Sequence, residues 1–365
     1  MVMALVTELG LDQEPHMLAN AALGGVGSIG RSASTLKTRT LAERRVFLGA
    51  IWLRSIFTTC SAEFDGIKFG RYAENCCRIL EDAMEHPDDL YLVQLIRMQR
   101  IADSSRMTLH NEALENSPGF PMFLSIGVAS LVKSVQDMGT TLSLELPQAA
   151  LMVVCYHMVQ VHIYKIALED RLFPTSRGEY STTHIPNPYP SDTPILDRND
   201  LLSSCWTATK AMTRTILTLP PLLMFSMPYP MWLQLAHSLL VFSRLLTVRD
   251  STWDHSRPTI MADFRDTILG LSQRLEEVMN HGVQLVPSRR LPDIFHTLVE
   301  RLKEISLNIG MNSVDFAVQH HQVPDSSEAF LMSSEALDAI DQFLMREAAQ
   351  TSLFNFSSYG GEAWV

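Results

Sequence analysis

The sequence L-A-E-R-R-V-F-L-G-A-I-W-L-R-S-I-F (Leu41–Phe57) opens the stretch Leu41–Leu109, which decides the fold of this chain. Apolar residues recur there at intervals of three and four, and this spacing places them on one stripe of a helix. The stripe consists of Val46, Phe47, Ala50, Ile51 and Phe57. The charged residues between them, Glu43, Arg44, Arg45 and Arg54, can reach water. The segment is therefore predicted to be a core helix.

A second helix is predicted at the far end of the stretch, in D-D-L-Y-L-V-Q-L-I-R-M-Q-R-I-A-D (Asp88–Asp103). Leu92, Leu95, Ile96 and Ala102 form a similar apolar stripe there. Asp88 and Asp89 precede that stripe, and short carboxylates readily accept hydrogen bonds from the first free N–H groups of a helix. We therefore expect these two aspartates to cap the helix.

The rest of the chain continues the helical pattern. Further helices are predicted over Met1–Leu11, Pro121–Met138, Pro147–Glu169, Asn199–Leu219, Pro230–Val248, Pro258–His281 and Leu291–Ser306, with Gly282 ending the sixth as a C′ glycine. No stretch alternates at period two for long enough to require a sheet. The predicted fold class is all-α, a large multi-helix domain.

Composition and charge limit the possible functions. The chain has 365 residues, of which 46% are hydrophobic and 19% charged, so it can bury a large core. Its formal net charge of -11 opposes binding to a phosphate backbone. The apolar runs Ala149–Leu168 and Met231–Val248 contain His, Gln, Lys or Arg, and these predict buried helices rather than membrane spans. The N-terminal residues lack the basic region of a signal peptide.

Three ordered blocks in the first half carry a family resemblance. They are E-R-R-V-F-L-G-A-I-W-L (Glu43–Leu53), Y-A-E-N-C-C-R-I-L-E-D-A (Tyr72–Ala83) and Y-L-V-Q-L-I-R-M-Q-R-I-A (Tyr91–Ala102). A later block covers Leu219–Leu245 and is followed by Trp253 and Asp254. In this order they resemble the regulatory middle domain of fungal binuclear zinc-cluster transcription factors, over roughly the first three quarters of the chain.

The cysteine count does not fit the zinc cluster of that family. A binuclear cluster needs six thiolates in two close groups, and the chain has five scattered cysteines: Cys60, Cys76, Cys77, Cys155 and Cys205. The zinc cluster is therefore expected to be absent. Cys76 and Cys77 point about 100° apart on a helix, which predicts one packed thiol and one half-exposed thiol.

The sequence predicts two regions. Residues 1–320 are expected to form the helical regulatory domain, which begins part-way through the usual domain of the resembled family. It includes a Gly/Ser/Thr-rich loop over Gly24–Thr40 and a proline-rich surface excursion over 173–198. Residues 321–365 form an acidic and aromatic C-terminal tail. Acidic and aromatic residues alternate there as in activation segments, and a docked C-terminal helix over Ser334–Ala349 is the other interpretation.

Nucleotide and diphosphate chemistry are the enzyme alternatives. Gly25–Gly30 matches the dinucleotide glycine pattern, but no strand precedes it, and a flexible loop is favoured. A terpene-cyclase-like all-α enzyme needs two magnesium-binding acidic clusters. Asp88–Leu92 lacks the final acid of the first cluster, and Asn199–Thr207 ends in Thr207 where the second needs Glu. Both fit better as helix N-caps, so we expect no enzyme.

Histidines and buried amides give no stronger site. His157 and His162 lie five residues apart, so they do not share a helix face, and His320 and His321 lie in a predicted loop. Gln160, His162, Gln234 and His237 could line a ligand cavity, although ordinary buried hydrogen bonding is favoured. We assign no catalytic, cofactor-binding or metal-binding residue and no cofactor.

The resemblance implies a nuclear transcription regulator, acting in the family often on biosynthetic gene clusters of secondary metabolism. We expect protein partners in a homo- or hetero-oligomer or in the transcription machinery, a small-molecule effector, and no direct DNA or membrane binding by this chain. A helical interaction protein without DNA binding, or a truncated copy, is the alternative.

Overall fold

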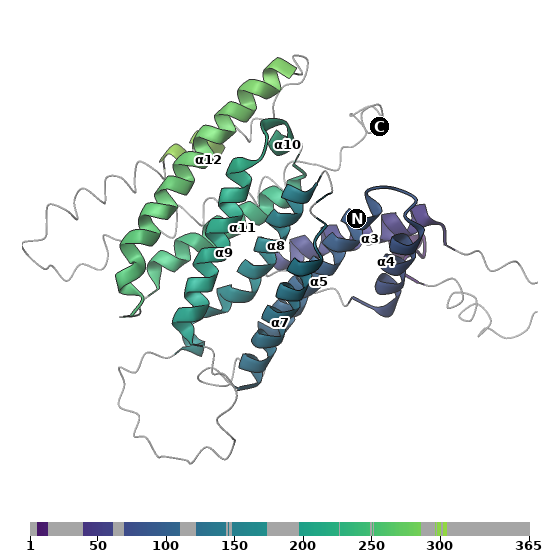
Figure 1. Cartoon of the computed structure of the whole chain (residues 1–365), viewed down its shortest axis with the longest axis horizontal. Coiled ribbons are helices and arrows are strands. Elements are labelled where there is room, and N and C mark those ends of the chain that lie inside the picture. Colours follow the sequence, from purple (N-terminus) through teal and green to yellow (C-terminus); the bar gives the residue numbers. More distant parts are fainter. Residues whose placement is uncertain are drawn as a thin grey trace, which may run out of the picture. The chain divides into compact units, whose positions relative to one another are not determined.

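The computed structural model describes residues 6–13, 39–60, 69–109, 122–143, 145, 148–173, 197–225, 227–248, 250, 252–285, 296, 298–300 and 302–304. Within these ranges all regular structure is helical and no strand occurs, which confirms the all-α prediction (Figure 1). The chain divides into two compact units, Met1–Leu201 and Leu202–Val365. Each unit is described by itself.

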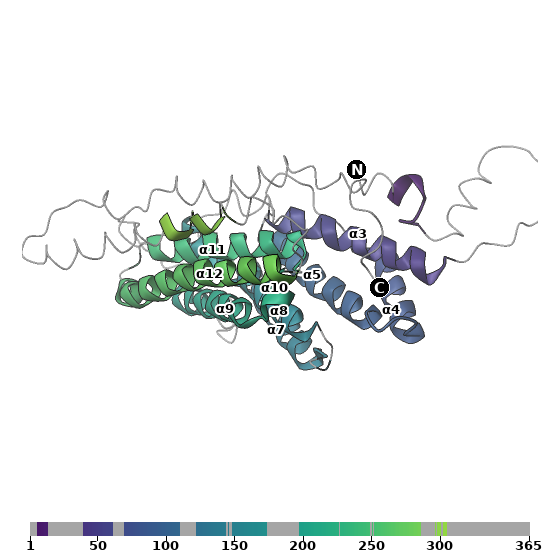
Figure 2. The same cartoon turned by 90° about the horizontal axis from the view of Figure 1, so that it is seen from above.

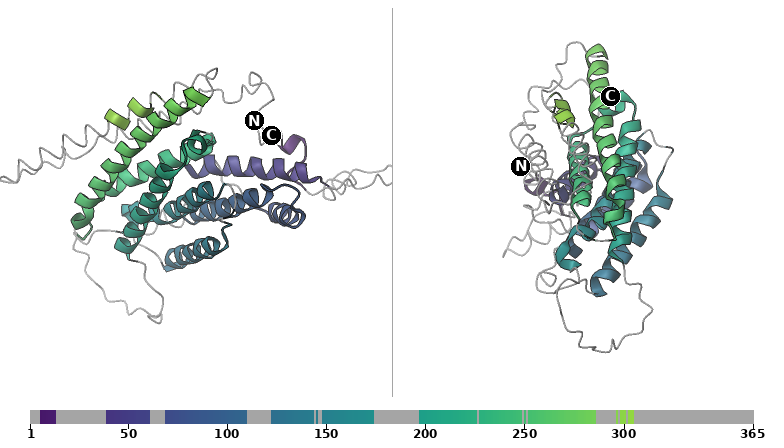
Figure 3. Two further views of the ribbon diagram at one scale, coloured as in Figure 1. Left: turned by 45° about the horizontal axis from the view of Figure 1, so that its top comes forward. Right: turned by 90° about the vertical axis from the view of Figure 1, so that its left-hand side faces the viewer.

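The first unit is organised around α3 (Leu41–Cys60) and α5 (Asp89–Leu109), which pack against each other (Figure 3). A capping box begins α3: the backbone N–H of Thr40 donates to Glu43 Oε2 at 2.8 Å, and the N–H of Glu43 donates to Thr40 Oγ1 at 3.2 Å. Phe47 and Ile96 are 5% and 3% exposed, as predicted for core positions. Val46 differs from the prediction, because it is 57% exposed and points away from that core.

Helix α4 (Arg71–Ala83) packs on both α3 and α5. Its buried residues, Ala73, Cys76, Cys77 and Leu80, follow the i, i+3, i+4, i+7 spacing of a single stripe. The prediction of one packed and one half-exposed thiol is therefore wrong. Both thiols are buried because a stripe this wide includes two positions 100° apart. The helix ends at Met84, whose left-handed backbone (φ 42°) lets its N–H bond Leu80 O at 2.9 Å.

Helices α7 (Met122–Thr141) and α8 (Ala149–Tyr164) pack against α5 and against each other. Gly139 permits close approach of α7 and α8, since a Cβ there would lie 2.8 Å from the hydroxyl of Tyr156.

The window Ala149–Leu168 is the one part of the described chain with the length and composition of a membrane span. It is 61% buried inside the protein, as expected for a core helix. The window ends in the 3₁₀ helix η1 (Lys165–Leu168).

A second 3₁₀ helix, η2 (Asp170–Leu172), closes the first unit together with Arg198 at the start of α9 (Arg198–Thr218). Arg198 is 6% exposed, donates from Nε to Ala167 O at 3.0 Å and pairs with Asp170 at 2.5 Å. Its guanidinium also lies 5.1 Å from the ring centroid of Phe173.

The second unit contains most of α9, together with α10 (Pro221–Phe225), α11 (Tyr229–Thr247), η3 (Asp254–Ser256) and α12 (Arg257–Leu285). Figure 2 shows α11 and α12 side by side, and Phe242 stacks edge-on against Phe264 between them at 5.2 Å. Two arginines of α12 satisfy free helix carbonyls: Arg257 donates to Val248 O at 2.7 Å, and Arg274 donates to Leu219 O.

Helix α12 corrects one predicted boundary, because it continues through Gly282 to Leu285. A glycine inside a helix costs about 1 kcal/mol relative to alanine but does not by itself end the helix. Several expectations lie largely outside the described residues: the Gly24–Thr40 loop, the excursion over 173–198, the Leu291–Ser306 helix and the 321–365 tail. The predicted extent of the regulatory domain, 1–320, stays a prediction.

Candidate functional site

A row of buried polar side chains lies between α3 and α5, and we call it the α3/α5 polar seam. It consists of Ser55, Thr59, Gln99 and Asp103, none more than 5% exposed. Ser55 Oγ donates a hydrogen bond to Asp103 Oδ2. Thr59 Oγ1 donates to the backbone carbonyl of Ser55 at 3.0 Å and accepts from Gln99 Nε2 at 3.2 Å. The four residues therefore connect the two helices through polar contacts inside an apolar core.

Helix geometry brings these residues together. Ser55 and Thr59 are four residues apart on α3, and Gln99 and Asp103 are four apart on α5, so each pair lies on one helix face. Apolar neighbours, including Ile56 (0% exposed) and Ala102 (1%), enclose the seam. Because buried polar groups need partners with defined geometry, the seam fixes how α3 aligns with α5.

Asp103 is the most strongly perturbed group of the seam. Burial raises the pKa of Asp103 to about 6, while the hydrogen bond from Ser55 and the charge of Arg106 act in the opposite direction. Its Oδ1 is buried and has no hydrogen-bond partner among the described residues. The carboxyl group therefore changes its proton occupancy close to neutral pH, where an exposed aspartate would be fully ionised.

The chemistry available to the seam is limited to hydrogen bonding and protonation of one carboxyl. Ser55 donates to Asp103, so the hydroxyl is held by an acid and no imidazole takes part in the bonds described above. The seam residues are enclosed by the core rather than facing a cleft that could admit a substrate. The arrangement therefore suits a role in setting helix alignment.

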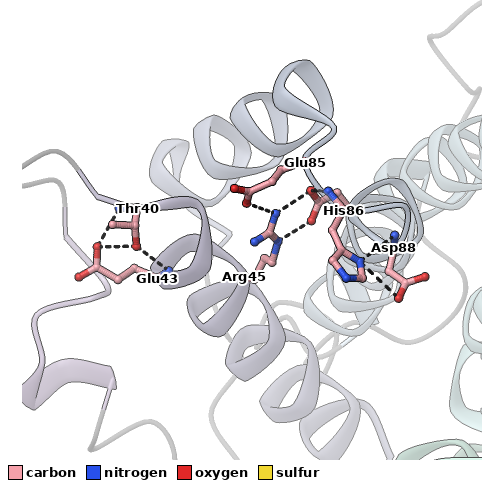
Figure 4. A network of polar contacts seen from close by, with 7 residues as sticks. Thr40, Glu43, Arg45, Glu85, His86 and Asp88 are labelled. Atoms are coloured by element: carbon pink, nitrogen blue, oxygen red, sulfur yellow. Dashed lines mark hydrogen bonds and ion pairs between the residues drawn. The ribbon is translucent and has the colours of Figure 1, made fainter. Parts of the chain in front are cut away.

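Charged side chains hold the opposite end of the same helices (Figure 4). Arg45 of α3 donates from Nε and Nη2 to the two oxygens of Asp89, at 2.6 and 2.9 Å, and from Nη2 to Glu85 at 2.7 Å. The hydrogen bond from Arg45 keeps the pKa of Asp89 below its ordinary value. This contact joins the start of α3 to the start of α5, and the bond from Ser55 to Asp103 joins later turns of both, so the two helices run in the same direction.

Two further arginines connect α5 with α4. Arg97 donates to both oxygens of Glu81, at 3.0 and 2.8 Å, and Arg100 pairs with Glu74 at 2.8 Å. The bonds from Arg97 lower the pKa of Glu81. Both carboxylates of these pairs are half-exposed, so each pair contributes less to stability than Arg45–Asp89, whose carboxylate is buried.

The predicted acidic clusters occupy different places. The carboxylate of Asp89 accepts from Arg45 and from the N–H of His86 (3.0 Å), which lies before the helix, so the predicted capping role is wrong. Because Asp89 is buried beside Arg45, its carboxylate serves as the counter-ion of that arginine. Asp88 accepts from Gln148 at 2.9 Å. Asp200 is exposed in the first turn of α9. Within the described residues no group of three or more His, Cys, Asp or Glu could hold a metal ion.

The predicted cavity residues divide between the two units, Gln160 and His162 in the first and Gln234 and His237 in the second. His157 Nδ1 lies 2.9 Å from Gln160 Oε1, and burial lowers the pKa of His157. His162 is 3% exposed, and its carbonyl accepts from Ser105 at 3.0 Å. Gln234 is also 3% exposed but belongs to the second unit. Gly25–Gly30, His320 and His321 lie outside the described residues.

Sequence reasoning missed the α3/α5 polar seam. The signal was present as polar residues spaced four apart inside apolar stripes, Ser55 with Thr59 and Gln99 with Asp103. Taken alone, each of these polar side chains would be expected to face solvent. Only the packing of α3 on α5 shows that all four are buried. The T-x-x-E capping box at Thr40 was also readable in the sequence.

Two curated fungal proteins are similar to this chain. One, named transcription factor opdL of Penicillium oxalicum, is 25% identical over 286 residues, which cover 76% of this chain and 47% of that protein. The other, named transcription factor himD of Aspergillus japonicus, is 20% identical over 332 residues, covering 89% of this chain and 51% of that protein. The chain thus spans about half the length of these curated relatives. No protein-family profile and no solved structure matches it.

Proposed function

We propose that this chain is a transcription regulator of the fungal zinc-cluster type, corresponding to the regulatory domain and not to the DNA-binding module. The observation that carries the proposal is the similarity to two fungal proteins named as transcription factors, over 76% and 89% of this chain. The all-α architecture agrees with the resemblance of the Leu41–Leu109 stretch to that regulatory domain.

DNA contact is assigned to another polypeptide segment or to a partner. Five cysteines are one fewer than a binuclear zinc cluster requires, and the formal net charge is -11. A nuclear location, targets in a biosynthetic gene cluster, a small-molecule effector and contacts with the transcription machinery complete the proposal. They are supported only by the resemblance.

A tethering experiment tests the regulatory role. The full chain is fused to a heterologous DNA-binding domain and placed upstream of a reporter gene in a filamentous fungus. We expect reporter expression to rise or fall severalfold relative to the DNA-binding domain alone. A Phe47→Ala variant, which removes a core side chain, should lose the effect together with the fold. An unchanged reporter, with the fusion protein present in the nucleus, would contradict the proposal.

DNA binding by the chain alone is tested separately. The purified protein should protect no defined site at near-physiological salt, because it lacks the zinc cluster and is acidic. A footprint at nanomolar protein concentration would contradict the proposal that another polypeptide segment or a partner contacts the DNA. The alternative, a helical interaction protein that sequesters partners, is favoured by the same cysteine count. It predicts no effect when tethered but inhibition of another regulator when the untethered chain is overexpressed.

A further inference from the structure

The outward face of α3 carries no polar side chain at its central positions, unlike the outer faces of α4 and α7. At 100° per residue, five positions fall within an arc of about 80° opposite the core. They are Ala42, Val46, Gly49, Leu53 and Phe57. We call these residues the α3 outer stripe. Val46 is 57% exposed, Ala42 is also exposed, and Leu53 and Phe57 are half-buried.

Helices α4 and α7 show the usual pattern of a polar outer face. The exposed positions of α4 include Arg71, Arg78 and Asp82. On α7, the exposed Ile126 lies among Ser130, Lys133 and Ser134. Apolar residues scattered singly on a surface are normal, but a stripe along a helix marks an interaction surface. The α3 outer stripe therefore has the pattern of an interaction surface.

The spacing of the stripe indicates that a helix is the occupant. Ala42, Val46, Gly49 and Leu53 are separated by four, three and four residues, which is the a/d spacing of a helix–helix seam. Gly49 at the centre is open on its outward side, because a Cβ built there would meet no atom within 4 Å. Two helices can therefore approach closely at Gly49.

We infer that the occupant is a second copy of this chain, with the two α3 helices packed antiparallel around Gly49. In this arrangement Phe57 faces the small Ala42 of the other copy, and Leu53 faces Val46. Phe57 thus meets a small residue, and the two layers on each side of Gly49, Phe57 with Ala42 and Leu53 with Val46, have similar volumes. A parallel pair would place Phe57 against Phe57 and Ala42 against Ala42, so the helices would diverge.

Charges beside the stripe favour the same arrangement. Glu43 and Arg54 lie on one flank of the stripe, at about 60° and 80° in the helical projection where Val46 is at 0°. In the antiparallel pair, Glu43 of each copy lies opposite Arg54 of the other. Glu43 already accepts from the Thr40 N–H at 2.8 Å, and its Oε1 lies 3.4 Å from Nη1 of Arg39 in its own chain, so Arg54 of the other copy adds a second cation beside it. Arg54 has no ion-pair partner within the part of the chain that the structure describes. Two identical attractive contacts follow from the two-fold symmetry.

The experiment measures self-association of the full chain by sedimentation velocity between about 1 and 100 µM, the range expected for a small interface. We expect a concentration-dependent dimer. Gly49→Gln should raise the dissociation constant about tenfold or more, while the monomer, which has open space there, keeps or gains thermal stability. Val46→Glu should weaken the dimer similarly, because it buries a charge. The matched control Ile126→Glu changes an equally exposed apolar residue on α7 and should leave the dimer intact.

Cross-linking tests the antiparallel register. In a Cys60→Ser background, Gly49→Cys should cross-link to its own copy. Val46→Cys should cross-link only when mixed with Leu53→Cys. A monomer at all concentrations, a dimer insensitive to both Gly49→Gln and Val46→Glu, or self-cross-linking of Val46→Cys alone would each overturn the proposal. These outcomes do not depend on the transcriptional role, which the tethered reporter tests on its own.

Discussion

Arg45 of α3 holds both carboxylate oxygens of Asp89 at 2.6 and 2.9 Å, and Asp89 is only 1% exposed. The pair joins the first turns of two helices that are 44 residues apart in sequence. Its geometry is bidentate, which is the strongest form of an arginine–carboxylate contact. The contact is formed by the stretch that carries the family resemblance, so its disruption should affect the whole first unit.

The first prediction concerns this pair. Arg45→Met leaves the Asp89 carboxylate buried without its partner and should lower the free energy of unfolding by about 3–5 kcal/mol. Adding Asp89→Leu removes the unpaired buried carboxylate and should restore much of the lost stability. Arg100→Ala is the control, because Arg100 is half-exposed and should cost within about 0.5 kcal/mol. Urea titrations of the four proteins give the values. Equal stability of Arg45→Met and the parent would show that the pair contributes nothing.

The second prediction concerns the apolar core between α3 and α5. Phe47→Ala and Ile96→Ala each remove a side chain that is at most 5% exposed, and each should cost about 2–5 kcal/mol. Thermal melts and soluble yield should fall together, since a whole domain is stabilised by only about 5–15 kcal/mol. Val46→Ala on the outward face should change monomer stability far less. If both core variants melt like the parent, the organising role of Leu41–Leu109 is wrong.

The third prediction concerns pH and Asp103. The folded-state pKa of Asp103 is about 6, above the ordinary value of 3.8, so the folded protein binds this proton more tightly than the unfolded chain. The protonated carboxyl of Asp103 makes its full contribution to the free energy of unfolding below pH 3.8, and this contribution is lost as the pH rises through about 6. Asp103→Asn removes the ionisable group and should stabilise the protein at pH 7.5 by about 2 kcal/mol.

The stabilisation by Asp103→Asn should shrink at pH 5, where the parent carboxyl is largely protonated. Denaturant unfolding of the parent and the variant at both pH values measures this difference. The pKa of Asp89 shifts in the opposite direction, because it is lowered in the folded protein. The stability that Asp89 contributes is therefore present above its ordinary pKa and is lost as the pH falls below that value. A gain from Asp103→Asn that is equal at both pH values would show that the carboxyl does not titrate as described.

The fourth prediction concerns the cysteines. Cys76, Cys77, Cys155 and Cys205 are free and buried, and burial raises the pKa of Cys77 and of Cys155 to about 12. At pH 8 these four thiols should react slowly with a disulfide reagent in the native protein. All five cysteines of the chain should react rapidly after unfolding in guanidinium chloride. Rapid modification of more than one thiol in the native protein would contradict the burial of these four thiols.

The sequence by itself determined the helical architecture and the approximate position of most of the long helices. Apolar periodicity located α3, α5, α7, α8, α9 and α11 to within a few residues, because a helix buries one stripe at fixed spacing. The core roles of Phe47 and Ile96 followed from the same pattern. Gly282 was misjudged because a glycine near a helix end is compatible both with a cap and with a continuing helix.

Only the tertiary structure decided which polar side chains are buried. The sequence predicted a cap at Asp89 and assigned no role to Asp103, because periodicity reports the face of a helix but not what covers that face. Packing of α3 on α5 placed Arg45 against Asp89 and Ser55 against Asp103, and packing of α4 on both helices buried Cys76 and Cys77. The pKa values, the buried contacts and the exposed α3 outer stripe arise from pairings between segments distant in sequence, which no local pattern encodes.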